Sequence, residues 1–287
     1  MTGYLPNGLL ALACAGFLAN SHGRASADVV TLDWTIAETL VALDNPPVGL
    51  AEIPSYQRWA GAEALPEGVR DVGLRSQPNR ELIAQQAPDH ILLSPLFMRL
   101  SDQLEAIAPV TGLSTYQLGE PLWQRLQNTT HSLAELSGNQ AAAAALVNAV
   151  ETYLDQQKAQ LVEQPPLLVV QFIDARHLRV FGEQSLFQAV IERLGLTNVW
   201  QQPTNQWGFS TAALEELLNY PDALIVVVEP LPVSMRDGFS SNALWQHLPA
   251  VQENRVVRLP AVWSFGGLPS AARFAERLSE ALLARQG

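Results

Sequence analysis

Residues 139–164 read NQAAAAALVNAVETYLDQQKAQLVEQ and are followed directly by Pro165-Pro166. Asn139 is a favoured N-cap residue, and the two prolines end any helix that precedes them. One apolar stripe with helical spacing runs along the stretch, through Leu146, Val150, Leu154 and Leu161. At 1.5 Å per residue such a helix is ~39 Å long. The stretch predicts a rigid helix that joins two lobes; an ordinary surface helix is the alternative.

The joining helix is favoured because a series of alternating strands and helices ends before it and a second series begins after it. The first series has strand candidates at Val29–Leu32, Val48–Ala51, His90–Leu93 and Thr111–Tyr116, and helix candidates at Thr35–Leu43 and Asn79–Ala87. The second has strand candidates at Leu167–Phe172, His177–Phe181, Leu224–Val228 and Val256–Leu259, a helix at Leu186–Leu194 and a closing helix with Phe274, Leu278 and Leu282 on one face. This alternation predicts α/β lobes with largely parallel sheets.

A short internal echo supports two related halves. Residues 81–89 end in Pro-Asp before an apolar strand candidate, and residues 215–222 do the same half a chain later. Each is expected to be a helix that leads into a buried strand, although this connection is common in α/β folds. The predicted organisation is an N-terminal α/β lobe at 28–138, a linking helix at 139–164 and a C-terminal α/β lobe at 165–287.

The N-terminus resembles an export signal. Residues 9–19 form an apolar run, LLALACAGFLA, which is shorter than the ~20 residues that a membrane span needs. Ala25-Ser26-Ala27 follows and predicts cleavage before Asp28, so that residues 1–27 are a signal peptide. Residues 1–8 contain no Lys or Arg, which leaves open a lipid anchor on Cys14 or a misassigned start. Cleavage would remove the only cysteine, in keeping with an oxidising compartment.

Composition excludes several classes of protein. Lys and Arg total 17 against 28 Asp and Glu, a net charge of −11, which argues against nucleic-acid and anionic-membrane partners. A single cysteine rules out thiolate zinc and iron–sulfur sites, and no two histidines have metal-site spacing. No nucleophile elbow, dinucleotide fingerprint or Walker sequence occurs either. We therefore expect no catalytic residues, no metal ligands and no cofactor.

Aromatic residues suggest a binding cleft instead. Trp59, Trp207 and Trp263 lie in loop-like contexts, the last two beside Gly or Pro, and Arg75 lies in a loop before a predicted helix. Tryptophans in such loops often line ligand clefts, and loops at strand ends gather ligands in α/β folds. The alternative is that the aromatics anchor loops and that the arginine is a surface residue.

Longer stretches carry a family resemblance. They are residues 71–82 (DVGLRSQPNREL), 176–188 (RHLRVFGEQSLFQ), 204–208 (TNQWG), 248–255 (LPAVQENR) and 260–263 (PAVW). With these stretches the chain resembles the periplasmic ferric-hydroxamate-siderophore-binding proteins of ABC importers. The resemblance covers nearly all of the chain after residue 27. It implies two α/β lobes joined by one long helix, the helical-backbone periplasmic binding protein fold, with small closure on binding.

The resemblance also implies site residues. Arg75 matches an arginine that donates hydrogen bonds to hydroxamate oxygens, and Trp59, Trp207 and Trp263 match tryptophans that line the cleft. Phe97 and Phe265 stand where family members can carry tyrosine, so two hydroxyl donors are lost, which could alter specificity; Ser264 or Tyr56 are candidates to compensate. The siderophore itself saturates the iron with oxygen ligands, so no metal ligand is expected from the protein.

Partners follow from the same resemblance: a ferric siderophore, and an ABC permease with its ATPase that docks on acidic residues, here Asp102 and Glu215 or Glu216. A solvated surface is the alternative for these acids. The expected protein is a monomeric, non-enzymatic binding protein of the periplasm. Rival hypotheses are the same fold with a catecholate siderophore, haem or a cobalamin as ligand; a hydrolase or other enzyme with a nucleophile–base pair in the cleft; and a scaffold protein whose cleft is packed shut.

Overall fold

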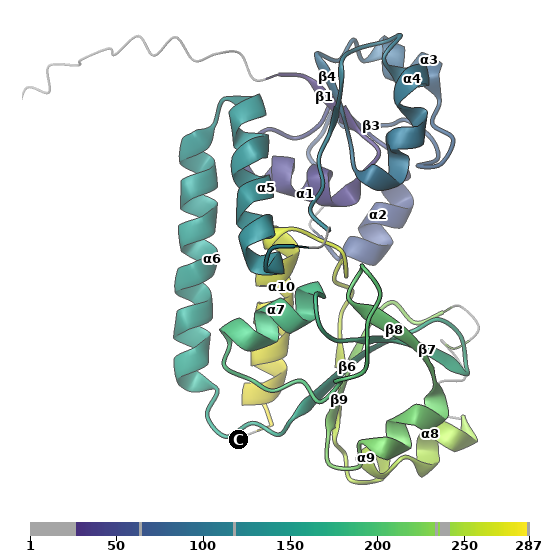
Figure 1. Ribbon diagram of the computed structural model, residues 1–287, viewed down its shortest axis with the longest axis vertical. Coiled ribbons are helices and arrows are strands. Elements are labelled where there is room, and N and C mark those ends of the chain that lie inside the picture. Colours follow the sequence, from purple (N-terminus) through teal and green to yellow (C-terminus); the bar gives the residue numbers. More distant parts are fainter. Residues whose placement is uncertain (1–26, 63–64, 117–118, 233–234, 236–241, 286–287) are drawn as a thin grey trace, which may run out of the picture.

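The computed structural model describes residues 27–62, 65–116, 119–232, 235 and 242–285. The expected signal peptide lies outside these residues except for Ala27, and so does Cys14. Two α/β lobes follow one another along the long axis of the molecule, with helices beside and between them (Figure 1).

The N-terminal lobe contains a five-stranded sheet in the order β3-β2-β1-β4-β5 in which every pairing is parallel. Its strands are β1 (Val29–Thr31), β2 (Gly49–Leu50), β3 (Arg70–Asp71), β4 (His90–Leu93) and β5 (Val110–Gly112). Its helices are α1 (Trp34–Ala42), α2 (Ile53–Ala60), α3 (Arg80–Gln85), the 3-10 helix η1 (Pro95–Leu100) and α4 (Ser101–Leu104). The parallel sheet predicted for this lobe is confirmed.

The last strand of this lobe was predicted wrongly at Thr111–Tyr116, since β5 begins at Val110 and ends at Gly112. It is an edge strand that pairs only with β4, and β4 itself ends at Leu93, opposite Gly112. Leu113 still donates its backbone N–H to the Leu93 carbonyl at 2.8 Å, but the residues after it lie beyond the end of β4.

The C-terminal lobe has a mixed sheet in the order β10-β9-β6-β7-β8. Its strands are β6 (Leu167–Phe172), β7 (His177–Phe181), β8 (Phe209–Ala213), β9 (Leu224–Val228) and β10 (Val256–Leu259). Its helices are α7 (Leu186–Arg193), the 3-10 helix η2 (Leu214–Asn219), α8 (Ala243–His247) and α9 (Pro249–Gln252).

The parallel arrangement expected for this lobe holds for β10, β9 and β6 but is wrong for β7 and β8, which are antiparallel. Only residues 173–176 connect β6 to β7, and so short a connection reverses the chain direction. Strand β8 was not predicted, and the helix expected at 215–220 is the 3-10 helix η2.

Three helices connect the lobes: α5 (Leu122–Ser137), α6 (Gln140–Gln160) and α10 (Leu268–Leu283). Asn139 is the N-cap of α6, as predicted, and accepts a hydrogen bond from the Ala142 N–H. Helix α6 ends at Gln160, so the expected helical stretch to residue 164 is too long by a turn. Gln164 precedes Pro165 and is therefore disfavoured in helical backbone, and Glu163, one residue earlier, already adopts a non-helical positive φ of 54°.

The long helix does not hold the lobes together alone. Helix α5, which was not predicted, buries Leu133 in a core cluster of the N-terminal lobe and Leu126 in one of the C-terminal lobe. Helix α10 packs against α1, α5, α6 and α7, and in Figure 1 it runs beside the sheet of the C-terminal lobe. A layer of three helices therefore braces the two lobes against large relative movement.

Candidate functional site

A cavity of about 710 Å³ lies between the lobes. Its size is within the range of small-molecule sites. The lining residues come from both lobes: Asp33, Thr35, Ile36, Arg75, Ser94, Pro95, Leu96, Leu113, Ser114, Thr115 and Tyr116 from the first, and Arg179, Gln206, Trp207, Phe209, Trp263 and Phe265 from the second.

Arg75 is the cation of the N-terminal wall and lies in the connection between β3 and α3. Its Nε donates to the Leu32 carbonyl at 2.9 Å, and its Nη2 lies 3.9 Å from Asp33 Oδ2. Its guanidinium carbon is 4.3 Å from the centre of the Trp34 ring and 4.8 Å from that of Phe97. Burial lowers the pKa of Arg75, while Asp33 and Glu52 oppose the shift, so the group stays charged. These contacts fix the guanidinium at the edge of the cavity.

Arg179 is the cation of the opposite wall and lies in the middle of β7. Its Nη1 donates to Gln171 Oε1 at 3.2 Å, and its guanidinium carbon is 5.2 Å from the centre of the Phe209 ring. Sequence reasoning missed this residue. The signal was present, because His177–Phe181 was predicted as a strand and alternation places Arg179 on the face opposite Leu178 and Val180.

Aromatic rings from distant segments form one apolar surface around Phe265. The ring centres of Trp207, Trp263 and Phe209 lie 5.5, 5.2 and 6.0 Å from that of Phe265. Tyr116 closes the surface from the N-terminal lobe, 5.9 Å from Trp207. Trp207, Trp263 and Phe265 were expected at the site, whereas Phe209 and Tyr116 were missed. Such a surface can pack against the carbon scaffold of a ligand.

The Trp207 loop needs the glycine that follows it. Gly208 has a φ of +77°, and a Cβ there would lie 2.2 Å from the backbone nitrogen of Ser185. The Trp207 N–H donates to Asn205 Oδ1 at 2.9 Å. The sharp turn thus directs the indole towards the cavity, where it contributes to the lining.

Helix α1 of the first lobe holds the aromatic loop of the second. Thr35 Oγ1 donates to the Phe265 carbonyl at 2.6 Å and accepts from Trp263 Nε1 at 3.1 Å. The Tyr116 hydroxyl donates to the Gly266 carbonyl at 2.8 Å. The two rings of the loop are therefore positioned by hydrogen bonds that cross between the lobes.

Glu38, one turn further along α1, anchors the start of α10. Its carboxylate accepts from the Gly267 N–H at 2.7 Å and from Ser270 Oγ at 2.6 Å, and lies 3.6 Å from Arg273 Nη1. Only 3% of the residue is exposed. Burial raises the pKa of Glu38, although Arg273 and the hydrogen bonds act in the opposite direction. This carboxyl fixes the distance between the lobes directly behind the cavity.

Two residues expected in the cleft do not line this cavity. Phe97 is buried at 4% exposure and stacks beneath Arg75, so it supports that side chain. Trp59 is half-buried and packs against the cluster that contains Trp34 and Tyr56. Tyr56 and Ser264, the candidates to supply a lost hydroxyl, are both 2% exposed and are absent from the lining.

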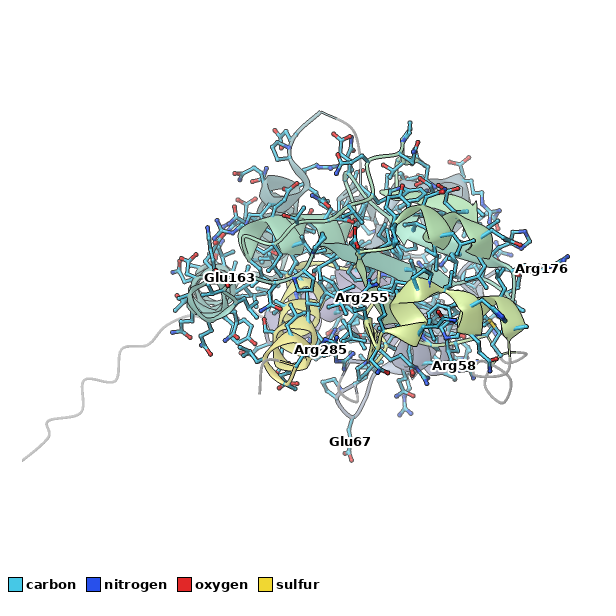
Figure 2. The ribbon with its side chains drawn as sticks, turned by 90° about the horizontal axis from the view of Figure 1, so that it is seen from below. Arg58, Glu67, Glu163, Arg176, Arg255 and Arg285 are labelled. Carbon is cyan, nitrogen blue, oxygen red and sulfur yellow. The ribbon has the colours of Figure 1, made fainter. Side chains whose placement is uncertain are left out.

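The expected docking acids lie on the two lobes. Asp102 is exposed on α4 of the first lobe. Glu215 is exposed and Glu216 half-buried on η2 of the second lobe. Other charged side chains such as Glu67 and Arg176 point away from the body of the molecule (Figure 2).

Within the described ranges, no cluster of three or more His, Cys, Asp or Glu side chains could hold a metal ion. Over the same part of the chain, no helix is long and apolar enough to cross a membrane.

Known proteins are similar to this chain in both sequence and fold. The chain is 33% identical to the iron(3+)-hydroxamate-binding protein FhuD of Escherichia coli strain K12, over 88% of this chain and 86% of that protein. It is 25% identical to the ferric enterobactin-binding periplasmic protein FepB of E. coli O6:H1, over 90% of this chain and 89% of that protein.

Among solved structures, the siderophore-binding protein FhuD of Vibrio cholerae with Fe³⁺–Desferal bound matches with a TM-score of 0.85 at 31% identity. The match covers 91% of this chain and 99% of that one. The family model described as periplasmic binding protein matches residues 29–262. The chain therefore belongs to the periplasmic binding protein family.

Proposed function

We propose that this protein captures an iron(III)–hydroxamate siderophore in the cavity between its lobes and delivers it to an ABC permease. One observation carries the proposal: a fixed guanidinium, Arg75, and a continuous aromatic surface border the same cavity of about 710 Å³, and the Arg75 guanidinium carbon lies 5.7 Å from the centre of the Trp263 ring. The relatives named for iron hydroxamates and for Fe³⁺–Desferal support the same ligand class. The chain is a binding protein, not an enzyme, as its family is.

In this proposal the two walls of the cavity bind different parts of the siderophore. A hydroxamate siderophore surrounds its iron with six hard oxygens, so the protein contributes no metal ligand. Arg75 directs Nε towards the Leu32 carbonyl and Nη2 towards Asp33, so Nη1 is available to donate to these negatively polarised oxygens. Trp207, Trp263 and Phe265 pack on the carbon scaffold. Phe97 and Trp59 act from behind, by supporting Arg75 and the Trp34 cluster.

Delivery requires a partner in the membrane. We assign the docking surfaces to Asp102 on one lobe and to Glu215 and Glu216 on the other. These carboxylates contact arginines of the permease, and the ATPase of the importer acts on the opposite side of the membrane. The protein acts as a monomer in the periplasm. No cofactor takes part, because iron enters and leaves with its chelator.

A catecholate siderophore is the second candidate. Catecholate complexes are more anionic than hydroxamate complexes, and the cavity has a second arginine, Arg179, that suits such a ligand. The similarity to a ferric enterobactin-binding protein points the same way.

A tryptophan fluorescence titration of the purified protein tests both candidates, because Trp207 and Trp263 line the cavity. The ligands are ferric desferrioxamine B, a ferrichrome-type hydroxamate, a ferric triscatecholate, haem and a cobalamin, with each iron-free siderophore as control. Saturable quenching by the ferric hydroxamates is expected. Saturation by the triscatecholate alone favours the second candidate, and no response to any hydroxamate overturns the first.

A further inference from the structure

The charges around the cavity are distributed unequally between its walls. The ionisable side chains among the lining residues are Asp33, Arg75, Arg179 and Tyr116. Burial raises the pKa of Tyr116 well above 10, so this hydroxyl is neutral. Arg75 is matched by Asp33 and lies close to Glu52, whose Oε1 accepts from the Arg75 backbone N–H at 3.1 Å. Arg179 has no carboxylate within 4 Å in the described part of the chain.

The Arg179 side chain is nevertheless held in place. It lies directly opposite Gln171 in the antiparallel pairing of β6 and β7, so both side chains lie on one face of the sheet. Gln171 is 1% exposed, and its Oε1 accepts from both Arg179 Nη1 and Ser264 Oγ. The rings of Phe209 and Phe265 flank the guanidinium, with centres 5.2 and 6.0 Å from its central carbon.

A half-buried cation without a counter-charge costs free energy, which an anionic ligand group would recover. Burial lowers the pKa of Arg179, and no neighbouring carboxylate offsets the shift. Arg75 does not need an anionic ligand group in the same way, because Asp33 already supplies its counter-charge. Among the lining residues that the structure describes, the cavity thus has one open position for an anion, on the C-terminal wall.

From this asymmetry we infer that Arg179 is a specificity-determining residue that binds a carboxylate of the siderophore scaffold. The inference rests on the proposed function. Three hydroxamates neutralise the charge of Fe³⁺, so the iron centre of such a ligand brings no net negative charge. The anion must come from elsewhere on the molecule. The chemical class is therefore a ferric hydroxamate with a free carboxylate beyond its iron centre, oriented with that carboxylate towards β7.

Three derivatives of one siderophore test this orientation. Ferric desferrioxamine B ends in an ammonium; acylation of its amine gives a succinyl derivative that ends in a carboxylate and a succinamoyl derivative that ends in a neutral carboxamide. The iron centre is identical in all three, and the two acyl derivatives have equal length. Affinities are measured by tryptophan quenching at constant ionic strength.

The protein is expected to bind the carboxylate derivative about tenfold or more tightly than the carboxamide, and the ammonium form least tightly, as a hydrogen bond between charged groups predicts. In Arg179→Gln the preference for the carboxylate should fall to within about twofold, and Arg179→Lys should restore part of it. Arg176→Gln is the matched control, because Arg176 is exposed just before β7 and points away from the body (Figure 2). Equal melting temperatures verify that the variants fold.

The outcomes distinguish a failure of the inference from a failure of the proposed function. If all three derivatives bind equally well and Arg179→Gln changes nothing, the inference is overturned while the proposed function stands. If the carboxylate preference persists undiminished in Arg179→Gln, another residue receives the anion and the inference fails. If none of the ferric derivatives binds, the proposed function fails and the inference fails with it.

Discussion

Arg75 and Arg179 face the same cavity from opposite lobes, but their surroundings differ. Arg75 lies between two aromatic rings with its charge matched by Asp33, whereas Arg179 is held by the neutral amide of Gln171. A matched guanidinium is suited to orient the polarised but formally neutral centre of a ferric hydroxamate. An unmatched one selects for charge. The comparison suggests that one wall recognises the shared chemistry of the ligand class and the other recognises an individual member.

The contrast between the two cavity walls depends on the relative position of the lobes, and Glu38 stabilises that position. Its replacement in Glu38→Ala should have the largest effect, a loss of about 3 kcal/mol in the free energy of unfolding. It leaves the Gly267 N–H and the Ser270 hydroxyl without their acceptor, and it leaves Arg273 without its carboxylate partner. Urea denaturation at pH 7 measures the loss. The matched control is Glu67→Ala, since Glu67 is exposed and points into solvent (Figure 2). Equal losses in the two variants would contradict the role of Glu38.

Removal of the matched arginine should affect every hydroxamate alike. In Arg75→Ala we expect affinity for all three desferrioxamine derivatives to fall by roughly 10- to 100-fold, the value of about 1.5–3 kcal/mol for a hydrogen bond to a charged group. Fluorescence titration measures the decrease, with Arg58→Ala as control because Arg58 is exposed on the same lobe (Figure 2). A decrease confined to the carboxylate derivative would reverse the assignment of the two walls.

The pH dependence of the free energy of unfolding provides a second test of the role of Glu38 between the lobes. Burial raises the pKa of Glu38 above its ordinary value of 4.5. Above pH 4.5 the folded protein therefore keeps a proton that the unfolded chain has released. This contribution to stability is complete below pH 4.5 and is lost as the pH rises through the raised pKa. The unfolding free energy of the wild type minus that of Glu38→Gln should fall over that range, by at most about 1.4 kcal/mol per pH unit. Denaturation curves at pH 4, 5, 6 and 7 measure it, and a constant or rising difference would contradict the raised pKa.

The smallest expected effect comes from a substitution that leaves both cavity arginines without a counter-charge. Asp33→Asn removes the counter-charge of Arg75 but keeps the N-cap of α1, because asparagine also accepts from the Thr35 and Ile36 N–H groups. Affinity for the carboxylate derivative should rise by about two- to fivefold, as expected for a partly screened charge pair. The carboxamide derivative should change less. A fall in affinity for the carboxylate derivative in the same titration would show that Asp33 aids binding rather than masks Arg75.

The two walls also differ in how many of their residues could be predicted from the sequence. Arg75 and the loop tryptophans Trp207 and Trp263 stood out because they interrupt periodic patterns beside Gly, Pro or a helix start. Arg179 did not, because it sits inside an alternating strand where only the direction of the side chain and its neighbours reveal a role. Phe97 is the converse case, because it matches a family position for a ligand contact but lies buried beneath Arg75 at the cavity wall.

The sequence alone determined the local elements: two α/β series, the helix after Asn139, and the loops that carry Arg75, Trp207 and Trp263. Their signals are periodicity, caps and breakers, which act over a few residues. Only the tertiary structure decided that β7 runs antiparallel, that α5 and α10 brace the lobes, and that Glu38 meets Gly267 across 229 positions of sequence. It also decided that one cavity arginine is matched and the other is not. The physical reason is that pairing, burial and charge compensation depend on which distant segments become neighbours, and local patterns do not encode that choice.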